Sequence, residues 1–136
     1  MVKVIYGKKG MGKTKILLDA ANAMALEDAK NVVFIDDSNQ LMYNLSHKVR
    51  FINVSEFPPD SPAVFIGFLY GIISSNYDVN GIFIDGLTYF LKEDINTLEQ
   101  FFKEINCISQ KYNIAFYISI NGDLDKMPEY LKEYAA

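Results

Sequence analysis

The chain has 136 residues, of which 50% are hydrophobic and 22% are charged, with 8 glycines and 4 prolines. A chain of this length and composition buries a sizeable core without disulfides, so we expect one domain over residues 1–136 and exclude a disordered or fibrous protein. Its 13 basic and 17 acidic residues give a net charge of −4, which excludes a whole-domain electrostatic signature for nucleic acid.

The sequence predicts a cytoplasmic location. Cys107 is the only cysteine, and no Cys/His cluster has zinc-ligand spacing, which suits a reducing compartment. The first residues lack the basic start and long apolar stretch of a signal peptide. The longest apolar run, residues 63–73, contains two glycines and is too short to span a bilayer. We therefore expect no membrane span.

Short apolar runs and helical periodicity alternate along the first half of the chain. Residues 2–6 predict a strand, and residues 13–26 predict a helix because their apolar side chains recur at helical spacing. Residues 32–35 and residues 50–54 predict two further strands. The helix predicted over residues 13–26 begins directly after a turn rich in glycine and lysine.

The second half continues the alternation. A helix is expected over residues 63–75, with Ser61 as its N-cap and Pro62 at its first position. The remaining elements are a strand over 81–84, a helix over 94–112, a strand over 114–120 and a short helix over 128–134. This pattern predicts a three-layer α/β sandwich, with a mostly parallel five-stranded sheet and helices on both faces. Ligands of such sheets bind beyond the carboxyl ends of the strands.

Residues 7–14 form a phosphate-binding motif. They read Gly-Lys-Lys-Gly-Met-Gly-Lys-Thr and match G-x-x-x-x-G-K-[ST] at every fixed position, between a predicted strand and a predicted helix. Glycines let backbone N–H groups turn toward phosphate oxygens, and the helix N-terminus adds positive charge. We expect the Lys13 ammonium to contact the β- and γ-phosphates and the Thr14 hydroxyl to bind Mg²⁺. The full predicted nucleotide-binding set is Gly7, Lys8, Lys9, Gly10, Met11, Gly12, Lys13, Thr14 and Lys15.

With this motif the chain resembles the P-loop NTPase superfamily. In that superfamily an aspartate at the end of a later apolar strand holds the magnesium, and residues 82–85, Ile-Phe-Ile-Asp, are similar to this Walker B element. The resemblance implies a P-loop fold, ATP and Mg²⁺ as ligands, and Asp85 as a metal-binding residue beside Thr14. It also assigns catalytic roles to Lys13 and Asp85.

Two branches of the superfamily nominate Asp36 as the acid that orients the attacking water. In RecA-like and KaiC-like ATPases the strand that follows the P-loop helix ends in an acid, which is the position of Asp36 here. Residues 116–121 resemble the polar sensor strand of these ATPases. ParA-like and MinD-like ATPases carry a lysine at the position of Lys8, but they have glycine in place of Lys9 and a second acid in place of Ser38. Both branches stay open at this point. The chain also resembles small orphan bacterial P-loop proteins.

The number of arginines and the residues after the last predicted strand indicate how fast hydrolysis should be and which nucleotide should bind. Arg50 is the only arginine, so a homodimer or a partner protein could supply the arginine finger that often stabilises the transition state. Residues 121–124 lack the N-K-x-D pattern of guanine-specific GTPases, which favours ATP over GTP. We therefore expect Mg²⁺-dependent ATP binding with slow ATP hydrolysis. The alternatives are a nucleotide-dependent switch or scaffold that scarcely hydrolyses ATP, and a small-molecule kinase.

Overall fold

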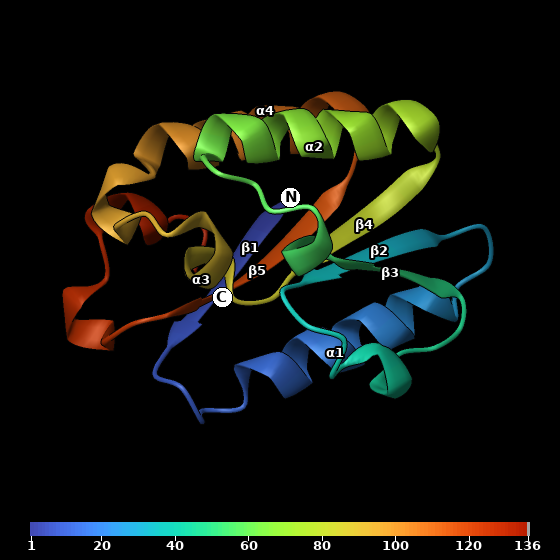
Figure 1. Ribbon diagram of the computed structural model, residues 1–136, viewed down its shortest axis with the longest axis horizontal. Helices are drawn as coiled ribbons and strands as arrows, with labels where there is room; N and C mark the ends of the chain where they lie inside the picture. The colour runs from blue at the N-terminus through green and yellow to red at the C-terminus, as the bar shows by residue number, and fades with distance from the viewer. Residues whose placement is uncertain (136) are drawn as a thin grey trace.

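Five parallel strands form one central sheet (Figure 1). The computed structural model describes residues 1–135. The strands are β1 (Val2–Gly7), β2 (Asn31–Asp36), β3 (Val49–Asn53), β4 (Val79–Ile84) and β5 (Ala115–Asn121), in the order β1-β5-β4-β2-β3. Every neighbouring pair is parallel, so the predicted five-stranded sheet is confirmed and is parallel throughout. All five carboxyl ends therefore meet at one edge of the sheet.

Helices cover both faces of the sheet. Helix α1 (Lys13–Ala25) lies on one face, and α2 (Pro62–Ser75) and α4 (Glu99–Tyr112) lie side by side on the other (Figure 1). A short helix, α3 (Leu87–Leu91), follows β4 directly. This α/β arrangement fits the predicted three-layer sandwich. None of the helices within residues 1–135 has the length and apolar character needed to span a bilayer.

Alternating side chains build two cores, one on each face of the sheet. In β2, Val32 and Phe34 belong to the core that includes α1, whereas Val33 and Ile35 belong to the core that includes α2 and α4. This alternation follows from the two-residue period of a strand. Because both faces are buried, the strands read as continuous apolar runs, and the sequence predicted their existence for that reason.

Three helical segments differ from the expectation. The predicted helix over residues 94–112 begins later, because the Asp94 carboxylate accepts a hydrogen bond from the Asn96 N–H and caps a separate 3-10 turn, Ile95–Thr97. Helix α4 then starts at Glu99. The predicted terminal helix over residues 128–134 contains only the 3-10 turn Glu129–Leu131, and α3 was not predicted at all.

Strand β1 lies at one edge of the sheet and is covered by the last described residues. It pairs on one side with β5, and on the other side the Val4 N–H donates to the Tyr134 carbonyl oxygen at 2.8 Å. Ala135 forms a parallel bridge with Val4 at the same place. The C-terminal segment thus satisfies backbone groups of an edge strand that would otherwise be open to pairing.

Candidate functional site

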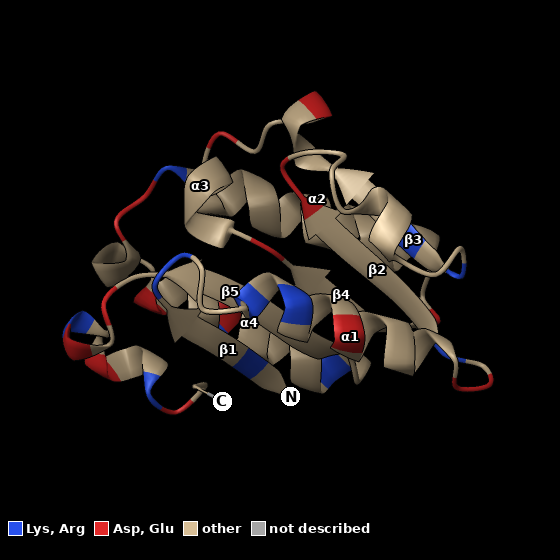
Figure 2. Cartoon of the chain, turned by 90° about the horizontal axis from the view of Figure 1, so that it is seen from below, with Lys and Arg blue, Asp and Glu red and all other residues tan. Residues whose placement is uncertain are grey.

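A cavity of about 610 Å³ lies at the carboxyl edge of the sheet. It is walled by the loop that precedes α1 and by the segments that follow β2, β4 and β5, as expected for the ligand site of a parallel sheet. Basic residues gather on this loop and on the first turn of α1, and acidic residues lie where β2 and β4 end (Figure 2). The lining includes Lys9, Gly10, Gly12, Lys13, Thr14, Asp36, Asp37, Asp85, Tyr89, Ser119 and Asn121.

The loop owes its shape to two glycines. Gly10 and Gly12 have φ values of 90° and 82°, in the left-handed region that side chains other than glycine rarely adopt. Gly12 is also the N-cap of α1, and its carbonyl oxygen accepts from the Ile16 N–H at 3.1 Å. No side chain caps the first turn of α1, so its leading N–H groups remain available to an anion at the cavity wall.

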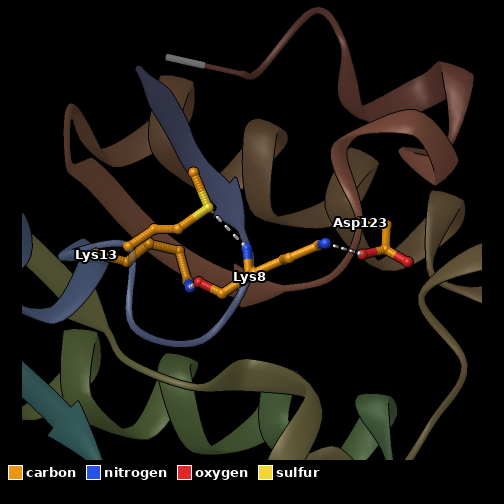
Figure 3. A network of polar contacts seen from close by, with 4 residues as sticks. Lys8, Lys13 and Asp123 are labelled. Atoms are coloured by element: carbon orange, nitrogen blue, oxygen red, sulfur yellow. Dashed lines mark hydrogen bonds and ion pairs between the residues drawn. The ribbon is translucent and has the colours of Figure 1, made fainter.

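Lys13 is buried at the start of α1. Its ammonium Nζ donates to the Lys8 carbonyl oxygen at 2.6 Å, so the side chain folds back along the loop (Figure 3). Burial lowers the pKa of Lys13, and the nearby carboxylate of Asp85 opposes this by favouring the charged form. An ammonium with this little access to water gains more from an anionic ligand than an exposed lysine does.

The carboxylate of Asp85 receives two hydroxyl groups. Thr14 Oγ1 donates to Asp85 Oδ2 at 3.1 Å, and Ser119 Oγ donates to Asp85 Oδ1. Ser119 Oγ in turn accepts from the Gly86 N–H at 2.9 Å. These contacts join α1 and β5 to the residue after β4, so each oxygen of the Asp85 carboxylate is held by one hydroxyl group.

Asp36 is buried at the end of β2, beside β4. Burial is the largest cause that raises the pKa of its carboxyl, the neighbouring carboxylates of Asp85 and Asp37 add to it, and the resulting pKa is about 7. The Asp37 N–H, which donates to Asp36 Oδ1 at 2.8 Å, works in the opposite direction by stabilising the charged form. The Asp36 carboxyl therefore changes its protonation near neutral pH.

Several residues of the cavity wall were not part of the predicted site, and two of them, Ser119 and Tyr89, make specific polar contacts there. Ser119 interrupts the apolar strand β5, and a hydroxyl inside an otherwise apolar run was the signal that could have identified it. Tyr89 lies on the unpredicted helix α3, and its hydroxyl accepts from Asn121 Nδ2 at 2.8 Å. The sequence around Tyr89 carries no comparable signal, because the helix has only five residues.

The structure places the other predicted nucleotide-binding residues away from this cavity. Gly7 ends β1, and its carbonyl oxygen accepts from the Gly122 N–H at 3.0 Å. Lys8 points outward and pairs with Asp123, with Lys8 Nζ 3.6 Å from Asp123 Oδ1 (Figure 3). Lys15 is exposed and pairs with Asp19 on the surface of α1.

Met11 and the only arginine also lie outside the cavity lining. The Met11 side chain covers the outer side of the loop, where its Sδ accepts from the Lys8 N–H at 3.2 Å. Arg50 is exposed on β3, three residues before the carboxyl end of that strand at Asn53. Among residues 1–135, no guanidinium therefore lines the cavity.

The oxygen donors of the site fit a small hard cation. The Thr14 hydroxyl and the Asp85 carboxylate already lie within hydrogen-bond distance, and Mg²⁺ prefers such oxygen ligands. Within residues 1–135 no group of three or more His, Cys, Asp or Glu side chains is arranged to hold a metal ion by itself. A magnesium ion here would need phosphate oxygens and water to complete its octahedral shell.

Neither a model of a known protein family nor a curated protein matches the chain. The chemistry of the site therefore follows from its geometry and from the likeness of residues 7–14 to phosphate-binding loops.

Proposed function

We propose that this protein binds ATP together with Mg²⁺ and hydrolyses it slowly, as a minimal P-loop ATPase. One observation carries the proposal: a buried lysine, a threonine–aspartate pair and a buried acid with a raised pKa line a single cavity. These residues come from the first turn of α1, the end of β2 and the position after β4, which lie far apart in the sequence. Their convergence supports a common ligand with several anionic oxygens.

The triphosphate would be held by the loop and by Lys13. The free N–H groups at the start of α1 and the turn made by Gly10 and Gly12 favour phosphate oxygens. Lys13 Nζ would exchange its contact with the Lys8 carbonyl oxygen for a charged phosphate oxygen, which forms the stronger hydrogen bond.

Thr14 and Asp85 would hold the magnesium ion. When bound, the ion neutralises part of the phosphate charge and orients the phosphates. Ser119 keeps the Asp85 carboxylate oriented through its own hydroxyl. The donor set thus supports a metal bound jointly by protein and nucleotide.

Asp36 would accept a proton from the attacking water. A carboxyl whose pKa lies near 7 is deprotonated in a large fraction of molecules at neutral pH, and it is basic enough to take a proton from water. Strand β5 lies between β1 and β4, so its polar end reaches both the loop and Asp85. This position supports the RecA-like resemblance over the ParA-like one.

The position of Arg50 favours slow turnover. Phosphoryl transfer is often accelerated by an arginine that stabilises the transition state, and Arg50 lies outside the cavity. The proposal therefore has two forms, which differ in whether the protein hydrolyses ATP with outside help or acts as a switch. A second copy or a partner protein supplies the arginine, or the protein acts as a switch whose partner affinity depends on the bound nucleotide. The single exposed cysteine, Cys107, supports a cytoplasmic setting for either form.

The decisive experiment measures Mg²⁺–ATP binding by calorimetry for the wild type, Lys13→Ala and the control Lys15→Ala. We expect Lys13→Ala to abolish binding and Lys15→Ala to retain it, because Lys15 is exposed and paired with Asp19. Wild-type protein that does not bind ATP would disprove the proposal.

Phosphate release then separates the enzyme from the switch. We expect a slow rate that Asp36→Asn reduces further without loss of ATP binding. An unchanged rate in Asp36→Asn would remove the catalytic role of this residue, and rapid release by the isolated monomer would contradict the need for an external arginine.

A further inference from the structure

A separate cavity, the tyrosine cavity, lies at the edge of the sheet opposite to the candidate site. It has a volume of about 380 Å³ and is lined by Tyr70, Gly71, Ile73, Ser74, Tyr77 and Tyr112. Tyr77 lies just before β4 begins at Val79, so this cavity is at the amino edge of the sheet, whereas the candidate site is at the carboxyl edge. The two cavities share no lining residue.

The topology of the sheet brings the ends of two helices to the tyrosine cavity. Helix α2 precedes β4, helix α4 precedes β5, and these two strands are neighbours. The helices therefore lie side by side, run in the same direction and both end at the amino edge of the sheet (Figure 1). The carbonyl groups at the C-terminus of a helix carry a partial negative charge. Two such ends at one cavity favour a cation.

The end of α2 has no basic side chain to balance this charge. Its last turn contains none, whereas the last turn of α4 contains Lys111. The Gly71 carbonyl oxygen near the end of α2 accepts only from neutral hydroxyls, those of Ser74 and Ser75, each at 3.0 Å. None of the six lining residues of the cavity carries a charge. A cationic ligand would therefore meet no repelling group in the lining.

Three aromatic rings complete the cavity. Tyr77 is 89% exposed, Tyr70 46% and Tyr112 37%, and none of them belongs to either core. Among residues 1–135 no stacked or edge-on ring pair includes any of the three. The faces of aromatic rings attract cations, and Lys111 Nζ already lies 5.4 Å from the centroid of the Tyr112 ring.

The absence of carboxylates from the lining decides which kind of cation fits. A metal ion needs several oxygen ligands, and a primary ammonium is strongly hydrated and needs acceptors for three N–H groups. A quaternary ammonium group has no N–H to satisfy, and it is the group that clusters of aromatic rings recognise. A lipid headgroup adds a phosphate beside this ammonium, and none of the lining residues is basic.

We propose that the tyrosine cavity binds a small free cation with a quaternary ammonium group, of the choline type, between the rings of Tyr70, Tyr77 and Tyr112. Cavities of about 300–1,000 Å³ are usual for small-molecule ligands, and the tyrosine cavity falls in that range. The site is independent of the proposed ATP site, because no residue lines both cavities.

The test compares the binding of choline with that of its neutral isostere, in which a carbon atom replaces the ammonium nitrogen. Proton NMR measures both affinities, since a methyl group held over aromatic rings shifts upfield. Tyr77→Leu removes one ring, and Tyr77→Phe keeps the ring without its hydroxyl. The matched control is Tyr43→Leu, because Tyr43 is 88% exposed and does not line the cavity. Circular dichroism verifies that each variant is folded.

We expect the wild type to bind choline at least about tenfold more tightly than the isostere, since only choline has a charge for the rings and helix ends. Tyr77→Leu should weaken choline binding about three- to tenfold, and Tyr77→Phe should stay within about twofold of the wild type. Tyr43→Leu should bind choline as the wild type does. Equal affinity for choline and the isostere, or an unchanged choline affinity in Tyr77→Leu, would overturn the proposal.

Two further measurements separate this site from a membrane surface and from the proposed ATP site. The protein should not sediment with phosphatidylcholine vesicles, and sedimentation that Tyr77→Leu abolishes would overturn the assignment to a free cation. Lys13→Ala should bind choline with wild-type affinity even though it loses ATP. A loss of choline binding in folded Lys13→Ala would contradict the independence of the two sites.

Discussion

The Thr14 hydroxyl donates a hydrogen bond to Asp85 Oδ2 over 3.1 Å, although 71 positions separate the two residues in the sequence. The contact joins the first turn of α1 to the residue after β4. It exists because β1, which leads into the loop before α1, and β4 end at the same edge of a parallel sheet. The two side chains thus form a ready pair of oxygen donors before any ligand binds.

The first prediction concerns this pair. Asp85→Asn replaces a carboxylate with a neutral amide, so magnesium should no longer strengthen ATP binding. We expect wild-type affinity for ATP to fall about 10- to 100-fold when EDTA replaces Mg²⁺, and the affinity of the variant to be nearly the same in both conditions. Calorimetric titration measures both. Asp19→Asn, which removes an exposed acid of α1, should retain the wild-type dependence.

The second prediction concerns pH and the stability of the fold. The pKa of the Asp36 carboxyl rises from 3.8 to about 7 on folding. Between these values the folded state holds a proton that the unfolded state has lost, so the contribution of Asp36 is favourable at low pH. It declines as pH rises toward 7, by up to about 4 kcal/mol.

Urea unfolding of the wild type and Asp36→Asn at a series of pH values checks this. The free energy of unfolding of the wild type, minus that of the variant, should decrease from about pH 4.5 to about pH 7.5. The difference between the two proteins cancels the titration of other groups. A difference that is constant or that increases with pH would contradict the raised pKa.

The third prediction concerns Ser119. Ser119→Ala leaves the Gly86 N–H without its acceptor and removes one of the two hydroxyls on Asp85. Because Ser119 is buried, we expect the free energy of unfolding to fall by about 1 to 3 kcal/mol. Ser74→Ala is the control, since Ser74 is exposed on α2 and bonds only along its own helix. If Ser74→Ala lowered the free energy of unfolding as much as Ser119→Ala, the buried hydrogen bonds of Ser119 would have no special weight.

The fourth prediction contrasts glycines that look alike in sequence. Gly67 and Gly71 lie in α2, and a Cβ atom at either position would meet nothing within 4 Å. Replacement by alanine should therefore raise the free energy of unfolding by about 0.5 to 1 kcal/mol per site. A Cβ atom at Gly122 would instead overlap the Tyr6 hydroxyl, so Gly122→Ala should cost about 1 to 3 kcal/mol. Thermal unfolding of the three variants gives the order directly.

Much of the fold was predictable because its strands are buried on both faces. The apolar runs that became β2, β4 and β5 needed no knowledge of their neighbours. The late start of α4 was not predictable in the same way, since Asp94 is a good N-cap and uses its carboxylate for a 3-10 turn instead. Helix α3 is too short to show a periodic pattern.

The residues of the candidate site were predictable from local sequence, but their arrangement in space was not. The loop motif places Lys13 and Thr14 by local spacing, and Asp36 and Asp85 each end an apolar strand. Their meeting depends on the strand order, which long-range pairing decides and no local pattern encodes. For the same reason the outward position of Lys8 was not predictable, because its partner Asp123 lies at the far end of the chain.

Strand β1, which leads into the loop before α1, has backbone partners within residues 1–135 in β5 and in the segment at Tyr134. During translation β1 emerges before α1, β2, β3 and β4, and its partner β5 emerges only after all of them. The loop therefore stays without its supporting neighbour until β5 has left the ribosome, and pairing over such a separation is slow. A nascent chain could make helix α1 early, but the loop and the first turn of α1 would not hold their places in the cavity wall until β5 had paired with β1.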